Sequence, residues 1–190
     1  MSAPDRPITL LIAALGGEGG GVLAGWIVAA AERLGFPVQS TSIPGVAQRT
    51  GATTYYIEIL PIAHRERGER RPVLALVPGI GDIDVLAASE LMEAGRAVTA
   101  GLVTPDRTLT IASLSRFYVM NEKIAMGDGR YDSGRLMQAI AQHSQRHVLF
   151  DMDEVARSTG AIVNAVMLGA IAGCGRLPIP AEEFERAIRA

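Results

Sequence analysis

The chain has 190 residues, of which 48% are hydrophobic and 20% charged, and its formal net charge is -2. This length and composition predict one folded domain over residues 1–190 with a sizeable core. A slightly acidic chain has no electrostatic attraction for nucleic acid or for an anionic membrane, so we expect neither as a partner. The single cysteine, Cys174, excludes an internal disulfide and a cysteine-ligated iron–sulfur cluster.

Targeting and metal signals are weak. Residues 1–6 lack the basic-then-apolar order of a secretory signal, and the apolar runs are too short to span a bilayer. We therefore expect a cytoplasmic protein. The histidines at 64, 143 and 147 show no ligand spacing with a carboxylate or a third nitrogen, so we expect no metal site within this chain.

The first half of the chain alternates between short strand-like runs and one helical run. The predicted order is a buried strand over 8–15, a helix over 22–33, a strand over 38–43, and strands over 53–60 and 73–77. A charged turn over 64–71 separates the last two strands, which predicts a β-hairpin.

The second half continues the alternation and ends in helices. The predicted order is a strand over 84–88, a helix over 89–100 with Ser89 as its N-cap, a strand over 107–112, a helix over 131–145 and a strand over 147–151. A turn over 153–157, a helix over 161–173 and a helix over 181–189 follow. The helix over 161–173 is apolar nearly all round, so we expect it to be buried.

These elements predict an α/β class fold: a Rossmann-like layered domain with a mostly parallel sheet, an inserted β-hairpin and a helical C-terminal third. The last helix reaches Ala190, where either a natural end or a truncation fits.

The most informative motif is the glycine-rich turn G-G-E-G-G-G at 16–21, between the first strand and the first helix. Glycine permits positive φ and close approach of a ligand, and a helix start offers N–H groups that lack intrahelical partners. Residues 19–24 fit the dinucleotide pattern G-x-G-x-x-[G/A], but the second strand offers no carboxylate for a ribose. Val22 stands where a P-loop requires lysine.

Glu18 lies within this turn, where its carboxylate would repel a phosphate. It could instead occupy the positive helix end or reach an arginine of a partner. Two interpretations stay open: the glycines only permit tight strand-to-helix packing, or they contact a ligand or another subunit.

Two further segments complete the candidate site. Residues 48–51, Q-R-T-G, follow the second strand, and in a parallel sheet they would lie on the same edge as the glycine turn. Arg49 could bind a carboxylate or a phosphate, or it could be an ordinary solvated loop residue. Residues 84–96 contain Glu93 and Arg96 at helical i, i+3 spacing, which structural stabilisation explains without catalysis.

Taken in order, these motifs resemble the gamma-type subunits of the 2-oxoacid:ferredoxin oxidoreductases, and among them the beta subunits of the indolepyruvate enzymes. The family patterns are G-x-G-G-Q-G, then R-G-G, then A-D-x-L-[LA]-A-x-E-x-x-E-A-x-R. The corresponding segments are A-L-G-G-E-G at 14–19, R-T-G at 49–51, D-V-L-A-A-S-E-L-M-E-A-G-R at 84–96, N-A-V-M-L-G-A at 164–170 and L-P-I-P at 177–180. Ala14, Glu18 and Thr50 depart from the pattern in a way that resembles the aryl-pyruvate branch.

The resemblance implies a subunit for the coenzyme A-dependent oxidative decarboxylation of indolepyruvate or another aryl pyruvate, giving an acyl-CoA, CO2 and reduced ferredoxin. Thiamine diphosphate, magnesium and 4Fe–4S clusters would lie on a larger alpha subunit, and this chain would bind none of them alone. Arg49 would hold the substrate carboxylate or the coenzyme A phosphate. The residues expected to face the partner's cofactor are Gly16, Gly17, Glu18, Gly19, Gly20, Gln48, Thr50 and Gly51.

Two alternatives remain beside this hypothesis. One is a free-standing Rossmann-like protein that binds a nucleotide or coenzyme A, which the pattern at 19–24 suggests. The other is a purely structural assembly domain.

Overall fold

The computed structural model describes residues 6–44, 52–63, 72–116 and 132–190. The strands are β1 (Ile8–Ala14), β2 (Val38–Ile43), β3 (Thr53–Ile59), β4 (Val85–Ala88), β5 (Leu109–Ser113) and β6 (Arg146–Phe150). The helices are α1 (Gly20–Arg33), α3 (Leu91–Thr99), α5 (Ser133–His143), α6 (Met152–Thr159), α7 (Val163–Gly173) and α8 (Ala181–Arg189).

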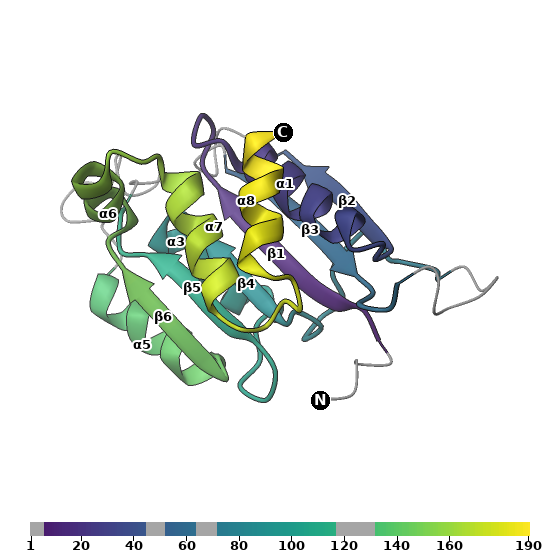
Figure 1. Ribbon diagram of the computed structural model, residues 1–190. Helices are drawn as coiled ribbons and strands as arrows, with labels where there is room; N and C mark the ends of the chain where they lie inside the picture. Colours follow the sequence, from purple (N-terminus) through teal and green to yellow (C-terminus); the bar gives the residue numbers. More distant parts are fainter. Residues whose placement is uncertain (1–5, 45–51, 64–71, 117–131) are drawn as a thin grey trace.

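The strands form one six-stranded sheet in the order β2-β3-β1-β4-β5-β6 (Figure 1). β1, β4, β5 and β6 pair in parallel, whereas β3 pairs antiparallel with both β2 and β1. The mostly parallel Rossmann-like sheet is therefore confirmed.

The inserted hairpin is formed by different strands from those predicted. β3 pairs with the preceding strand β2, and residues 73–77 form no strand, so the predicted pairing of 53–60 with 73–77 is wrong. The backbone N–H of Ala75 donates instead to the Glu58 carboxylate at 2.7 Å, and Val73 is 96% exposed. The run V-L-A-L-V at 73–77 is continuously apolar, but a side chain binds the Ala75 N–H that a neighbouring strand would otherwise accept from.

Helices cover both faces of the sheet (Figure 1). α1, α7 and α8 pack on one face over a core that contains Leu10, Ile12 and Leu23. α3 and α5 pack on the other face over Leu11 and Ala13. All seven residues of β1 are buried because successive side chains of this central strand enter opposite cores.

Two local predictions need correction. α7 is buried along one face only, through Asn164, Met167, Leu168 and Ile171, because its other side lies at the surface of the molecule. α3 begins after Glu90, whose carboxylate accepts a hydrogen bond from the Glu93 N–H at 3.1 Å. Ser89, the predicted N-cap, instead accepts a hydrogen bond from the Leu15 N–H.

The amino end of the sheet is held by a charged cluster around Asp84. Its carboxylate accepts hydrogen bonds from Arg6 at 2.8 and 2.9 Å, from Arg107 at 3.0 Å and from the Thr9 N–H at 2.9 Å. The predicted pair of Glu93 and Arg96 is also formed, at 3.1 Å. Asp84 and this pair therefore stabilise the fold, as the sequence suggested.

Across the described ranges, no single helix is both long and apolar enough to cross a bilayer. α6 and α7 meet that test only when taken together, and they are bent by 107° with respect to each other.

Candidate functional site

The candidate site lies at the carboxyl edge of the sheet, where the glycine turn joins β1 to α1. Ala14, at the end of β1, pairs with Thr53, and the neighbouring Thr54 pairs with Ile43 at the end of β2. Both ends of the β2–β3 connection therefore meet the sheet beside the glycine turn. The predicted residues Gln48, Arg49, Thr50 and Gly51 lie outside the described part of the chain.

The turn needs glycine at two positions because its backbone is left-handed there. Gly17 has φ 91° and Gly19, the N-cap of α1, has φ 75°. Gly19 makes no side-chain cap, so α1 begins with its first N–H groups uncovered by a capping side chain. Gly16 and Gly17 are exposed, so the turn is open at its surface.

Gly20 serves packing rather than the open side of the turn. A Cβ at this position would lie 2.7 Å from the Ala14 Cβ and 2.7 Å from the Tyr55 ring. The helix therefore approaches the sheet closely only because residue 20 has no side chain. The segment therefore combines an exposed turn, at Gly16 and Gly17, with tight helix-to-sheet packing, at Gly20.

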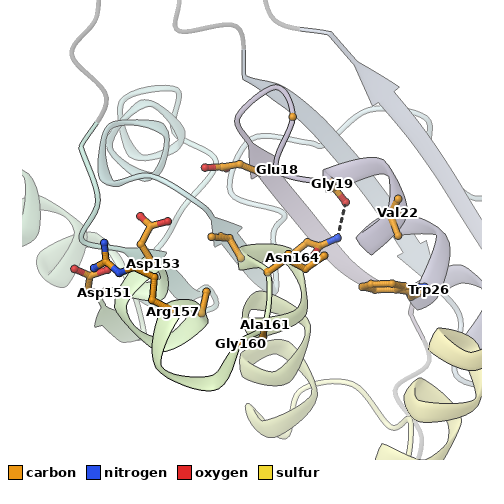
Figure 2. Close-up of a pocket in the computed structure, with 14 residues that line it drawn as sticks. Glu18, Gly19, Val22, Trp26, Asp151, Asp153, Arg157, Gly160, Ala161 and Asn164 are labelled. Carbon is orange, nitrogen blue, oxygen red and sulfur yellow. Dashed lines mark hydrogen bonds between the residues drawn. The ribbon is translucent and has the colours of Figure 1, made fainter.

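A pocket of about 790 Å³ opens beside the turn (Figure 2). The turn, α1, the β6–α6 junction and the start of α7 all contribute to its wall. Its lining residues are Gly17, Glu18, Gly19, Val22, Trp26, Asp151, Asp153, Ala156, Arg157, Gly160, Ala161, Ile162, Val163 and Asn164.

Glu18 is held at the mouth of this pocket by its own turn. Its carboxylate accepts a hydrogen bond from the Leu15 N–H at 3.1 Å. Burial raises the pKa of Glu18, hydrogen bonds from Ser89 and Leu15 lower it, and the nearby Asp153 carboxylate raises it again, with a net upward shift. Glu18 does not cap α1.

Asp151 and Asp153 approach the pocket from the end of β6. One oxygen of Asp151 caps α6 by accepting from the Glu154 N–H at 2.9 Å. One oxygen of Asp153 accepts from the Ser115 hydroxyl, which in turn accepts from Ser113 at 2.9 Å. The ends of β5 and β6 thereby fix where these two carboxylates stand.

Asn164 connects α7 to the glycine turn. Its Nδ2 donates to the Gly19 carbonyl at 3.2 Å, the dashed line in Figure 2, and the residue is 3% exposed. Sequence reasoning gave no site role to Asn164 or Trp26. A signal for Asn164 was present, because it is the only polar residue between 161 and 173. Asp151 follows a strand of the parallel sheet, which also marks the ligand-binding edge.

Of the predicted site residues that are described, Gly17, Glu18 and Gly19 line the pocket, Gly16 is exposed at the turn, and Gly20 is buried behind it. The fold and this site define an α/β domain whose glycine turn opens into a pocket at the carboxyl edge of its sheet.

Residues 9–190 match the family described as pyruvate ferredoxin/flavodoxin oxidoreductase, and the chain belongs to that family. This confirms the family resemblance of the motifs. The indolepyruvate oxidoreductase subunit IorB of Archaeoglobus fulgidus is 25% identical over 185 residues, which cover 96% of this chain and 84% of that protein.

Solved structures show the same fold. The pyruvate oxidoreductase subunit PORC of Thermotoga maritima matches with TM-score 0.63 and 17% identity, over 97% of this chain and 85% of that one. The gamma subunit of a keto/oxoacid ferredoxin oxidoreductase from Geobacter sulfurreducens matches with TM-score 0.56 and 16% identity, over 95% and 84%.

A third structure is the 2-oxoglutarate:ferredoxin oxidoreductase of Magnetococcus marinus, with 2-oxoglutarate, coenzyme A and succinyl-CoA bound. It matches with TM-score 0.61 and 14% identity, over 97% of this chain but only 27% of that one. The fold of this chain therefore also occurs as part of a much longer polypeptide.

Proposed function

We propose that this oxidoreductase-family chain is the subunit that completes the active site of a 2-oxoacid:ferredoxin oxidoreductase, while a larger alpha subunit carries the cofactors. The observation that carries the proposal is the open glycine turn, which faces a pocket at the ligand-binding edge of the sheet. Had the turn been sealed by its own side chains, packing alone would have explained the glycines.

The chemistry of the chain's own donors supports placing the cofactors elsewhere. A 4Fe–4S cluster takes four thiolates, and the chain has one cysteine. Within the ranges that the structure covers, no group of three or more acidic, histidine or cysteine side chains could hold a metal ion. Thiamine diphosphate, magnesium and the clusters therefore belong, in this proposal, to the partner.

We assign the substrate to the aryl pyruvates, with indolepyruvate first, because the relative IorB matches nearly the whole chain. The reaction is the oxidative decarboxylation of the 2-oxoacid with coenzyme A. The carboxylate would leave as CO2, and the acyl group would form a thioester with coenzyme A, whose thiol releases its proton. Iron–sulfur clusters on the partner would supply the path for the two electrons to ferredoxin. We place the complex in the cytoplasm.

In this proposal the glycine turn and the β2–β3 connection have different roles in binding. Glu18, Asp151 and Asp153 make the pocket unfavourable for phosphate, so the anion contact falls to Arg49, which holds the 2-oxoacid carboxylate or a coenzyme A phosphate. The wall that faces the partner's cofactor is shaped by Gly16, Gly17, Glu18, Gly19, Gln48, Thr50 and Gly51. Gly20 supports this wall from behind, because it lets α1 pack closely on the sheet.

The test is purification of the tagged chain from its native cells, identification of co-purified subunits by mass, and assay of indolepyruvate- and coenzyme A-dependent ferredoxin reduction. We expect turnover by the complex and none by the chain alone. Arg49→Ala should lower kcat/KM by about 10²-fold or more. Arg33→Ala, at the far end of α1, is the matched control. Turnover by the isolated chain, or unchanged turnover of Arg49→Ala, would contradict the proposal.

A further inference from the structure

The pocket beside the glycine turn is acidic. Glu18, Asp151 and Asp153 all line it, and Arg157 is the only basic side chain among its lining residues. Asp151 and Asp153 each use one carboxylate oxygen within the fold, to cap α6 and to bind Ser115. In the described chain, the second oxygen of each has no hydrogen bond. The pocket therefore favours a ligand that brings positive charge and hydrogen-bond donors.

Asn164 gives independent evidence for a missing donor. Its Nδ2 is used by the Gly19 carbonyl, but its Oδ1 is buried and has no hydrogen-bond partner among the residues described. The residue is 3% exposed and its side chain extends from α7 toward the glycine turn, between Glu18 and Trp26 (Figure 2). A buried acceptor without a donor costs free energy, so this oxygen points to an absent group that donates.

The other half of the pocket is apolar. Trp26 and Val22 line it from α1 (Figure 2). Ile162 and Val163 line it from the start of α7. Val22 is 52% exposed and Ile162 is 62% exposed, so the rim itself is hydrophobic. The face of a tryptophan attracts a guanidinium or ammonium group, and exposed apolar side chains that gather beside a polar site mark a surface that another protein can cover.

We propose that this pocket binds an arginine side chain, flanked by an apolar residue, that the larger partner subunit supplies. The inference rests on the proposed function, because it requires that such a partner exists. A guanidinium carries five donors in a planar fork, which suits a site with several separate acceptors better than a lysine ammonium does. An exposed apolar rim around the acidic centre favours a polypeptide over a free cation. The contact would seat the glycine turn against the partner without a phosphate at the turn.

Trp26, the only tryptophan in the chain, reports directly on the pocket. The full chain is titrated with N-acetyl-argininamide, and Trp26 emission is followed; N-acetyl-citrullinamide is the uncharged control of the same shape. We expect a saturable change with the arginine probe only. The variant carrying both Glu18→Gln and Asp153→Asn should bind it about tenfold more weakly. Glu185→Gln, an exposed carboxylate of α8, should bind it as the wild type does.

The second measurement is assembly. In the complex purified through the tagged chain, the double variant should raise the dissociation rate of the partner subunit about tenfold, and circular dichroism confirms that it folds. Equal responses to the two probes, or no response, would overturn the proposal. Binding of the arginine probe without any effect on assembly would also overturn it, in favour of a small cationic ligand. The Trp26 titration needs no turnover, so it tests the arginine pocket independently of the assigned reaction.

Discussion

Glu18 and Ser89 accept hydrogen bonds from the same backbone group, the Leu15 N–H, at 3.1 Å each. Ser89 directly follows β4, and Leu15 directly follows β1. This shared donor links the ends of two adjacent parallel strands and sets the position of the only acidic residue in the glycine turn.

Ser89→Ala removes one of the two acceptors and the hydroxyl that stabilises the ionised Glu18. Because Ser89 is 2% exposed, we expect the free energy of unfolding to fall by about 1 kcal/mol. The pKa of Glu18 should rise further. Urea unfolding and a carbon-13 NMR titration of Glu18 measure the two effects, with the exposed Ser158→Ala as control. An unchanged Glu18 titration would show that the hydroxyl does not reach the carboxylate.

The pH dependence of stability follows from the direction of the Glu18 shift. Burial raises its pKa above the ordinary value of 4.5, so the folded state binds more protons than the unfolded state between that value and the folded pKa. The free energy of unfolding contributed by Glu18 therefore decreases as the pH rises through this window. Glu18→Gln removes the dependence, so the stability of the variant relative to the wild type should increase as the pH rises above 4.5. Urea unfolding curves at several pH values test this, and a constant difference would contradict it.

Neighbouring glycines of α1 should respond in opposite ways to alanine. Gly20→Ala places a Cβ 2.7 Å from both Ala14 and Tyr55, and we expect a loss of about 1–3 kcal/mol in the free energy of unfolding. Gly21→Ala places it no closer than 3.4 Å from the Tyr55 hydroxyl, and helix propensity should leave stability unchanged or raise it by up to about 1 kcal/mol. Thermal unfolding of the two variants under the same conditions tests this prediction. Equal losses of stability would refute the close approach at Gly20.

Much of the fold could be predicted because its signals are local. The strands β1 and β2 and the helix α8 begin and end within a residue of the expected positions, since apolar runs, Gly35 and Pro180 mark them in the sequence. Residues 73–77 were mispredicted because a strand also needs a partner, and the Glu58 side chain occupies the donor of Ala75.

The candidate site was predicted only in part, for a similar reason. The glycine turn is a contiguous motif, so the sequence shows it. Trp26, Asp153 and Asn164 come from three separate elements, and only the packing of α1, α6 and α7 brings them to one pocket. Ser89 has the residue type of an N-cap, but its role is decided by Leu15, 74 positions away.

Arg107 of the amino-end cluster pairs with Asp82 as well as with Asp84, and these two acidic residues should differ in their contribution to stability. Asp84 is 6% exposed and binds two arginines, so Asp84→Asn should cost about 2–4 kcal/mol of unfolding free energy. The side chain of Asp82 is 49% exposed and, among the described residues, pairs only with Arg107, so Asp82→Asn should cost about 0–1 kcal/mol. Chemical denaturation of the two variants measures both losses of unfolding free energy. Similar losses would mean that the cluster acts through its total charge rather than through the buried contacts of Asp84.

The reversed direction of β3 has a consequence for how such subunits diverge. The connection that leaves β2 after Ile43 and returns at Thr53 is anchored at both ends by ladder pairs. In the proposed function this connection carries the anion contact of Arg49, so insertions, deletions or exchanges between these anchors would alter that contact while the strand register is preserved. Under that proposal, evolution or a protein engineer could change selectivity at this edge and leave the rest of the sheet unchanged.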